Sequence, residues 1–400
     1  MTVPARGPLR LMLDRRYGPF FLATFVAGSG NWLHVITSGI VVFSLTGSSL
    51  AVGLVGIAQF GSFLLMTPLA GELADRVDRR TVLIASYSTA ALASAVLAAL
   101  TWKLGPQALI IIGVTVLLGL GHAISIPSVL AIVPNIVSHK ELSAGVALNT
   151  VAVNLARVVG PVLGAFIYAS SGAAAAFAFN ALSHTPMILV LVFIIPSNNR
   201  PRGQPRAQLG EAVRAVREDR GLVLAFAGVV AMGYALDPIT TLSPSAAVEI
   251  GRSESFVGYI VSAFGAGAIL AVTLATMLRR RFGPLLTGAV GLIAMGASLI
   301  GWSVASSPSA VLMMLAAAGV GYITSVTDIT STIQERSPDA LRGRMMALWS
   351  AALLGPRPIA AALNGWTADT AGIRNALILA GLIPIATGVA IISRRRTIPA

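Results

Sequence analysis

The sequence is a succession of long apolar stretches, separated by short polar connections that carry most of the charges. An α-helix of roughly 20 apolar residues crosses the hydrocarbon core of a bilayer, which is about 30 Å thick. Twelve stretches meet this length, with expected bounds 18–45, 50–71, 82–102, 107–132, 142–169, 173–195, 221–248, 256–278, 285–305, 309–333, 345–368 and 373–393. We therefore expect an all-α polytopic membrane protein with twelve transmembrane helices.

The composition excludes most other classes of protein. Only 11% of the 400 residues are charged and 56% are hydrophobic, whereas a soluble domain carries roughly 25% charged residues. A single soluble domain and a disordered chain are therefore excluded. The chain has no cysteine, so it forms no disulfide scaffold and no thiolate metal site. We expect neither a cofactor nor a bound metal.

The basic residues are distributed unevenly over the connections. Of the 28 Lys and Arg residues, 23 fall on one set of alternate connections, which includes both termini and the longest loop, and three fall on the other set. Cytoplasmic loops of membrane proteins are enriched in Lys and Arg. We therefore expect a multi-pass protein of the bacterial cytoplasmic (inner) membrane with both termini in the cytoplasm. The net charge of +13 then reflects the basic residues of the cytoplasmic loops, which set the orientation of the helices. We therefore expect no nucleic-acid partner.

The chain also contains an internal repeat. Its longest polar connection, from Pro196 to Arg220, divides the twelve stretches into two sets of six. Six-helix repeats are typical of transporters, whose substrate site lies between the repeats. We expect an N-terminal six-helix bundle over 1–195, a cytoplasmic linker over 196–220 and a C-terminal six-helix bundle over 221–400.

Two motifs resemble those of a known family. Residues 71–80 read Gly-Glu-Leu-Ala-Asp-Arg-Val-Asp-Arg-Arg and are similar to the loop 2–3 signature of the major facilitator superfamily. Residues 157–165, with their Gly-Pro pair, resemble the span-five motif of its antiporters. Asn154 with Arg157, and Gln334 followed by Arg342, Gly343 and Arg344, resemble the drug:proton antiporter branch that includes enterobactin exporters and macrolide-efflux proteins.

The resemblance implies the major facilitator fold, with two pseudo-symmetric halves, and a conformational switch. It also implies that Asp75 lies close to the start of span eleven, near Arg344. Glycines at helical spacing in span five are expected to pack it tightly against the other half. The expected switch residues are Gly71, Asp75, Arg76, Arg79, Arg80, Gly160, Pro161 and Gly164. We further expect a monomer.

Four charged residues fall clearly within the expected spans, namely Arg157, Asp237, Asp328 and Arg357. A charge at the centre of a membrane helix costs at least about 2.5–3.5 kcal/mol, so each needs a partner or water. Two are positive and two negative, which makes pairing among themselves a hypothesis. The two prolines beside Arg357 predict a broken helix there.

Asp237, Asp328 and His34 are the candidates for proton coupling. Asp237 precedes Pro238, which is expected to kink span seven; the alternative is an acid at the outer end that faces water or forms a structural pair. Asp328 has Thr324, Thr327 and Ser331 nearby at helical spacing. The alternative to a coupling role is that these residues form a polar turn at the membrane interface. The alternative for His34 is a hydrogen-bonded packing residue. The candidates for the cavity and the substrate are Asn31, Gln59, Arg157, Asn180, Tyr234 and Arg357.

These features predict a secondary active transporter that exports small amphipathic or hydrophobic, drug-like molecules by alternating access, in exchange for protons. Its partners would be the small-molecule substrate, protons and the lipid bilayer. An alternative is a dedicated exporter of one secondary metabolite, such as a siderophore, and another is a non-transporting membrane sensor. We do not expect an enzyme, because neither HExxH nor Gly-x-Ser-x-Gly occurs in the sequence.

Overall fold

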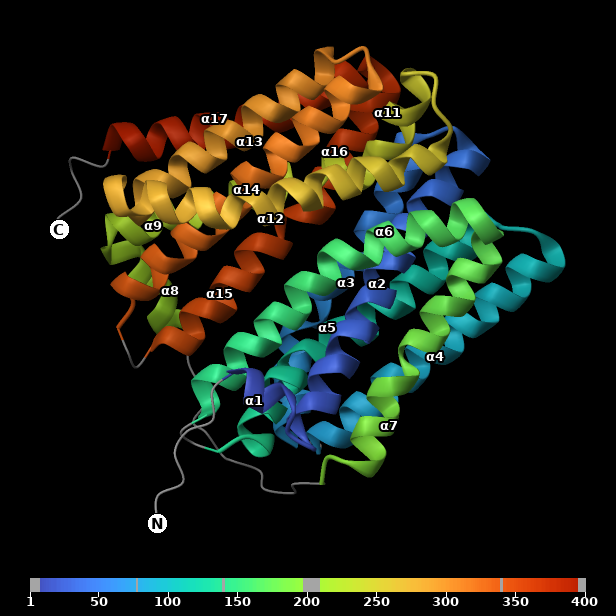
Figure 1. Cartoon of the computed structure of the whole chain (residues 1–400), viewed down its shortest axis with the longest axis vertical. Helices are drawn as coiled ribbons and strands as arrows, with labels where there is room; N and C mark the ends of the chain where they lie inside the picture. The colour runs from blue at the N-terminus through green and yellow to red at the C-terminus, as the bar shows by residue number, and fades with distance from the viewer. Residues whose placement is uncertain (1–7, 77, 139–140, 197–208, 339–340, 395–400) are drawn as a thin grey trace. The chain divides into compact units, whose positions relative to one another are not determined.

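The structure is a computed structural model that describes residues 8–76, 78–138, 141–196, 209–338 and 341–394. Side chains lie outside this description at 8–9, 63–64, 67–76, 127, 130–131, 143, 209, 254, 272–278 and 280. Every secondary-structure element of the described residues is a helix (Figure 1). The expected all-α architecture is therefore confirmed.

The chain forms two compact units. Unit 1 comprises Met1–Leu45 and Gly61–Gly203, and unit 2 comprises Thr46–Phe60 and Gln204–Ala400. Helix α3 (Ser49–Arg76) thus begins in unit 2 and continues in unit 1. This grouping by packing differs from the boundaries at 195 and 221 inferred from the repeat, which remain a prediction.

The other helices of each unit follow in chain order. Unit 1 contains α1 (Pro8–Met12), α2 (Tyr17–Thr46), α4 (Arg79–Leu104), α5 (Ala108–Ile136), α6 (Leu142–Ser183) and α7 (Thr185–Phe193). Unit 2 contains α8 (Leu209–Glu218), α9 (Arg220–Ala235), α10 (Pro238–Thr241), α11 (Ser243–Glu249), the short 3-10 helix η2 (Glu254–Phe256), α12 (Val257–Phe282), α13 (Pro284–Val304), α14 (Pro308–Arg336), α15 (Arg342–Leu354), α16 (Pro356–Ala371) and α17 (Ile373–Arg394).

The lengths of these helices suit a membrane. Among the described residues, nine helical segments are long and apolar enough to cross a bilayer, and two shorter apolar helices cover Ser49–Ser62 and Val257–Ala271. One of the nine spans 50 residues, Ala144–Phe193, and Gly172 interrupts it with a φ of 80°. Glycine adopts this left-handed conformation without the steric cost that other residues incur. The segment is therefore long enough for two crossings, so the described helices are compatible with the twelve expected spans.

Two of the expected spans are broken rather than continuous. The stretch 221–248, expected as one helix, consists of α9, α10 and α11, with Asp237 and Leu242 at the junctions. Pro238 lacks an amide hydrogen and therefore cannot continue the hydrogen bonding of α9. The stretch 345–368 divides at Gly355 into α15 and α16, as the two prolines predicted.

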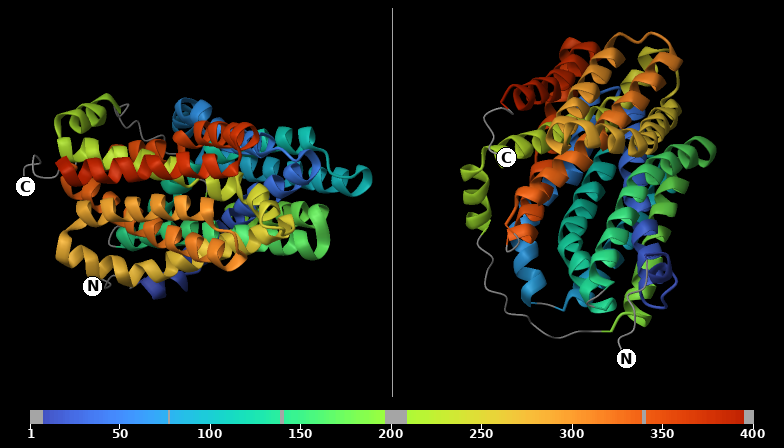
Figure 2. Two further views of the ribbon diagram at one scale, coloured as in Figure 1. Left: turned by 90° about the horizontal axis from the view of Figure 1, so that it is seen from above. Right: turned by 60° about the vertical axis from the view of Figure 1, so that its left-hand side comes forward.

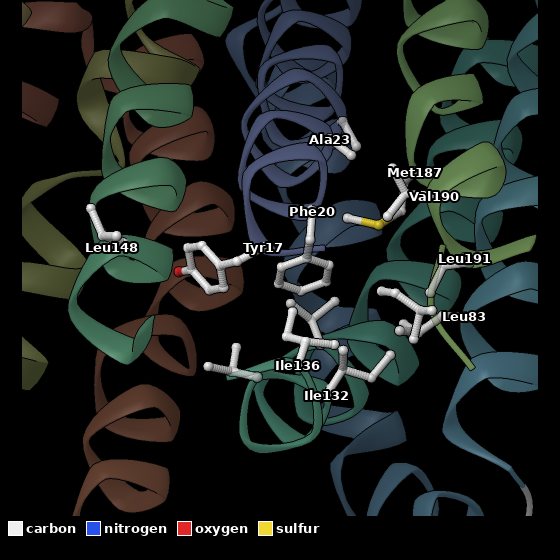
Figure 3. Packing of buried hydrophobic residues seen from close by; sticks show 14 of the residues in the cluster. Tyr17, Phe20, Ala23, Leu83, Ile132, Ile136, Leu148, Met187, Val190 and Leu191 are labelled. Carbon is white, nitrogen blue, oxygen red and sulfur yellow. The ribbon is translucent and has the colours of Figure 1, made fainter. Parts of the chain in front are cut away.

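The interior of unit 1 is an apolar cluster with residues from α1, α2, α4, α5, α6 and α7. Figure 3 shows Tyr17 and Phe20 of α2 at its centre, and both side chains are completely buried. The Tyr17 hydroxyl donates a hydrogen bond of 2.5 Å to the carbonyl oxygen of Gly145, which ties α2 to α6. The other labelled residues of the cluster are Ala23, Leu83, Ile132, Ile136, Leu148, Met187, Val190 and Leu191.

Unit 2 is organised around α9 and α13. Helix α13 packs against both α14 and α17 (Figure 2), and Leu292 of α13 meets Val229 of α9 and Ile329 of α14 in one core cluster. The amphipathic helix α8 contributes the buried Ala212 to this cluster. Glu211 of α8 also accepts a hydrogen bond from Arg344 of α15. Helix α8, which lies in the expected linker, is thus part of unit 2.

The first turn of α3 is capped by a residue from the far end of the chain. The Asp369 carboxylate accepts hydrogen bonds from the Ser49 amide (2.8 Å) and the Leu50 amide (3.0 Å), and another from the Ser48 hydroxyl (2.6 Å). The first amides of a helix have no partner within the helix, so a side-chain acceptor satisfies them. This cap explains why the start of α3 belongs to unit 2.

A second acidic residue, Asp219, caps the N-terminus of α9. Asp219 accepts hydrogen bonds from the amides of Gly221 (2.7 Å) and Leu222 (3.2 Å), and it forms an ion pair of 2.9 Å with Arg336 of α14. Burial raises the pKa of the Asp219 carboxyl, but the Arg336 hydrogen bond and the two amides outweigh burial and bring the pKa below its ordinary 3.8. The ionised carboxylate therefore stabilises the contact between α9 and α14.

Removing the cap on α3 should destabilise the protein. We expect Asp369→Ala to lower the free energy of unfolding by about 1 kcal/mol, because alanine cannot accept from the free amides. Asp369→Asn should retain most of the stability, since asparagine caps about as well as aspartate. Thermal unfolding in detergent measures both, with the neighbouring Thr370→Ala as control. An Asp369→Ala protein as stable as the parent would contradict the assignment.

The Asp219 ion pair should make stability depend on pH. A carboxyl whose pKa is lower in the folded state stabilises the protein above its unfolded pKa, and this contribution disappears as the pH falls through the folded pKa. Asp219→Asn keeps a capping oxygen but loses the charge. At pH 7 we expect it to be less stable than the parent by at most about 1 kcal/mol. The unfolding midpoints of the two proteins should converge as the pH falls below 3.8, the ordinary pKa of the carboxyl; a gap of constant size would refute the role of the charge.

Candidate functional site

The breaks in the two interrupted spans lie close together within unit 2. A Cβ atom on Gly233, in the last turn of α9, would lie 2.1 Å from the carbonyl oxygen of Leu353, near the end of α15. Only glycine permits backbones to approach this closely. The two helices therefore touch where each loses its regular hydrogen bonding, and Asp237 and Arg357 follow directly after these breaks.

The Asp237 carboxylate is buried, with 1% of the residue exposed, and it accepts two side-chain hydrogen bonds. Oδ1 accepts from the Thr241 hydroxyl at 2.9 Å, and Oδ2 accepts from the Asn364 amide at 2.8 Å. The Asn364 side-chain oxygen in turn faces the Tyr234 hydroxyl at 3.4 Å. Both carboxylate oxygens thus act as acceptors, an arrangement that suits the ionised form.

Arg357 is the largest fully buried side chain described, with 1% of the residue exposed. Its guanidinium carbon lies 3.8 Å from the centre of the Phe60 ring, which is a cation–π contact. It also interacts electrostatically with Asp237. Arg357 follows Pro356 in the first turn of α16, where the helix dipole disfavours a positive charge. The nearby carboxylate and the aromatic face compensate for this unfavourable position.

The segment of α3 in unit 2 borders the same group of side chains. A Cβ atom on Gly56 would meet the Ala361 side chain at 3.0 Å and would lie 4.0 Å from both the Asp237 carboxylate and the Thr241 hydroxyl. Glycine here lets α3 lie directly over α16. The buried pair is therefore enclosed by α3, α9–α10 and α16. We call the residues Tyr234, Asp237, Thr241, Arg357 and Asn364 the Asp237 cluster.

The cluster contains one acid and one base in a region with little water, and this combination has a chemical consequence. Protonation of Asp237 would remove the charge that opposes Arg357 and would convert one of its oxygens from an acceptor to a donor. Proton binding would therefore alter hydrogen bonds on α10 and α16 together. Such a group can link a proton to a rearrangement of helices.

Two members of the cluster, Thr241 and Asn364, were not among the residues expected from the sequence. Each lies at helical spacing from a residue that was expected: Thr241 is four positions after Asp237, and Asn364 is seven positions after Arg357. Positions separated by four or seven residues share one face of a helix. A search for polar residues on the faces of the buried charges would have found both.

Asp328 lies elsewhere in unit 2 and has a different partner. It is completely buried on α14, and its Oδ1 lies 3.7 Å from Nε of Arg279, in the last turns of α12. Arg279 also donates hydrogen bonds of 2.9 Å to Ser331 and to Glu335. The hypothesis that the four buried charges pair among themselves is therefore wrong for Asp328, because a helix-end arginine reaches it.

Arg157 lies in unit 1, where it faces α2. Its guanidinium carbon is 5.5 Å from the centre of the Trp32 ring. A Cβ atom on Gly160 would lie 2.4 Å from the Ser29 carbonyl oxygen, and one on Gly164 would lie 2.9 Å from that of Leu33. These glycines, with the buried Pro161 between them, hold α6 close to α2 of the same unit. Their expected packing against the other half of the chain remains a prediction.

His34 and Asn180 are buried in the interior of unit 1. The His34 Nε2 atom lies 2.9 Å from the Thr115 hydroxyl, and the ring packs on Phe177. The Asn180 amide donates a hydrogen bond of 2.8 Å to Ser94 of α4. These contacts join α2 to α5 and α6 to α4, so both residues contribute to packing; their roles in coupling and in substrate binding remain predictions.

The remaining expected residues do not form one group. Gln59 is buried on the unit 2 part of α3, and Asn31 is half-buried on α2. In the switch motif, the side chains of Gly71, Asp75 and Arg76 lie outside the described residues. Arg79 is half-buried. Arg80 donates hydrogen bonds of 2.6 and 2.8 Å to the carbonyl oxygens of Leu191 and Val192, at the end of α7.

A double-mutant cycle tests whether Asp237 and Arg357 act as a pair. Asp237→Asn and Arg357→Gln should each destabilise the protein, and the double variant should recover about 1–3 kcal/mol relative to the sum, as coupled buried groups do. Thermal unfolding in detergent provides the measurement. Asp237→Asn combined with Arg279→Gln is the control, and it should be additive because Arg279 serves Asp328. Additivity in both cycles would show that the pair is not coupled.

Comparison with known proteins identifies the family. The model of the family described as transmembrane secretion effector matches residues 7–399. The enterobactin exporter EntS of Salmonella typhi is 24% identical over 351 residues, which cover 86% of this chain and 84% of the exporter. The protein of the same name from Escherichia coli is 24% identical over 352 residues, which cover 86% of this chain and 83% of the relative.

Solved structures show the same fold. A bacterial homologue of the human lysosomal transporter Spinster, in an inward-facing and occupied conformation, aligns with a TM-score of 0.76 at 13% identity and covers 96% of this chain and 98% of the homologue. A point mutant of the nucleoside transporter NupG aligns with a TM-score of 0.73 at 11% identity. The alignment covers 95% of this chain and 99% of NupG. The resemblance noted in the sequence is thus confirmed: the chain is a polytopic transporter of the major facilitator superfamily and belongs to its transmembrane secretion effector family.

Proposed function

We propose that this protein exports small organic molecules across the bacterial cytoplasmic membrane by alternating access, in exchange for protons, with both termini in the cytoplasm. The Asp237 cluster carries the proposal. It places one buried carboxylate and one buried guanidinium at the breaks of two membrane helices. Discontinuous helices with ionisable groups are common at the coupling and substrate sites of secondary transporters.

In the proposed cycle, Asp237 binds the incoming proton. Its ionised form accepts from Thr241 and Asn364 and balances Arg357. Protonation weakens these contacts, so the α10 and α16 segments become free to rearrange, and release of the proton restores them. Tyr234, which contacts Asn364, would transmit the state of the carboxylate to α9. Asp328 and His34 are secondary candidates for the same role.

Two kinds of cargo are supported by different observations. The apolar composition of the spans suits amphipathic, drug-like molecules. The relatives named enterobactin exporters, together with two arginines held against the aromatic rings of Trp32 and Phe60, support a single anionic secondary metabolite such as a catecholate siderophore. A guanidinium and an aromatic face can bind such a molecule through its charge and its ring.

Transport into proteoliposomes under an imposed pH gradient tests the coupling. We expect the gradient to accelerate substrate movement by the parent protein and Asp237→Asn to lose at least about tenfold of this acceleration, equivalent to about 1.4 kcal/mol. Glu249→Gln, an exposed acid in α11, is the matched control and should behave like the parent. Undiminished gradient dependence in Asp237→Asn would remove this residue from the mechanism.

The cargo is identified by export from cells that express the protein, using a panel of amphipathic dyes and an iron-free catecholate siderophore. Export of many unrelated dyes, abolished by a protonophore, would favour the drug-like class. Export of the siderophore alone, reduced in Arg357→Gln and Arg157→Gln, would favour the dedicated exporter. Equal accumulation of every compound with and without the protein would contradict both.

A further inference from the structure

A cavity of about 260 Å³ lies at one end of unit 2, away from the Asp237 cluster. It is formed where α12 and α14 end, where α13 begins, and beside the last turns of α17. Phe282, Leu285, Leu286 and Ile391 line most of it, while Glu335 and Arg336 provide its charged wall. The cavity is smaller than the roughly 300–1,000 Å³ pockets that hold drug-sized ligands, so it does not suit the transported cargo.

The position of the cavity along the helices places it at the membrane boundary. Helix α13 has 21 residues, which corresponds to about 31 Å, and this length matches a hydrocarbon core of about 30 Å. Its first residue, Pro284, is part of the cavity wall. The cavity therefore lies at the depth of the lipid phosphates. Asp219, which pairs with Arg336 in the wall, is separated from Asp237 by roughly 25 Å along α9.

The charges around the cavity favour an anion. The acidic wall residue Glu335 accepts from Arg279, and the basic wall residue Arg336 is matched by Asp219. Arg281, the residue before Phe282 of the cavity wall, carries an exposed positive charge. Its guanidinium carbon lies 5.5 Å from the ring centre of Phe282, a residue of the cavity wall.

We propose that this cavity binds the headgroup of an anionic phospholipid from the surrounding bilayer. The phosphate would contact Arg281, whose planar guanidinium can donate two hydrogen bonds to phosphate oxygens. The glycerol backbone and the first acyl carbons would lie against the four apolar residues of the wall. Basic pockets at the ends of membrane helices bind anionic lipid headgroups in this way.

Lipid binding by the purified full-length protein tests the proposal. Native mass spectrometry compares the retention of phosphatidylglycerol with that of phosphatidylcholine. We expect the parent to prefer phosphatidylglycerol and Arg281→Gln to bind it about fivefold more weakly, the factor expected from the loss of one arginine at a membrane surface. Arg281→Lys should bind with intermediate strength. Arg252→Gln removes an exposed arginine on the loop between α11 and η2 and should bind like the parent.

A second variant addresses the cavity itself. Leu286→Trp leaves every arginine in place but fills the space, so it should also lose the preference for phosphatidylglycerol. Glycerol phosphate, which has no acyl chains, should not compete with the lipid; effective competition would show a site for small anions and overturn the lipid assignment. Equal effects of Arg281→Gln and Arg252→Gln, or no preference in the parent, would also overturn it. Because the readout is binding, these results are independent of the proposed transport function.

Discussion

Ionised groups inside an apolar helix bundle persist only when other groups offset their charge and satisfy their hydrogen bonds. In unit 2 this requirement is met by placing Asp237 and Arg357 at breaks in their helices, with Thr241, Asn364 and Phe60 around them. The glycines and prolines around Asp237 and Arg357 are consistent with this arrangement. Gly56 and Gly233 let neighbouring backbones come close, and the prolines after the breaks end the regular hydrogen bonding. Two of the buried charges thus lie where their helices are interrupted, and irregular positions of this kind are common at functional sites.

Much of the architecture could be predicted from the sequence, because a bilayer leaves few alternatives. Backbone groups in hydrocarbon must be satisfied within the helix, so the lengths of the apolar stretches nearly determine the spans. Proline chemistry likewise predicted the breaks at Asp237 and Gly355. Partners were harder to predict. Arg279 was expected in a loop by its charge, yet it extends from the last turns of α12 to the buried Asp328. A long, flexible side chain such as that of Arg279 can reach a partner several ångströms away. The spacing of residues along one helix also does not reveal which neighbouring helix that side chain faces.

The same limit explains the site residues that the sequence did not single out. Thr241 and Asn364 are uncharged. Placing them in a membrane helix therefore does not carry the free-energy cost of a buried charge, which is what singled out Asp237 and Arg357. They enter the candidate site because each donates a hydrogen bond to the Asp237 carboxylate, Thr241 from the same segment and Asn364 from α16. Conversely, His34 and Asn180 attracted attention as polar residues in apolar spans, and the structure places them in packing contacts between helices. Polarity in a span is therefore an incomplete indicator of function, and the charge of the nearest partner is more informative.

The cap that Asp369 places on α3 also has a consequence for biosynthesis. The carboxylate and the Ser49 amide that it serves are separated by 320 residues. At about 5–20 residues per second, a ribosome needs roughly 16–64 s to make the intervening chain. Helix α3 therefore enters the membrane early, but its first turn receives its final hydrogen bonds only when nearly the whole chain has been made. Although it belongs to one of the first membrane segments to be synthesised, this turn is among the last to mature.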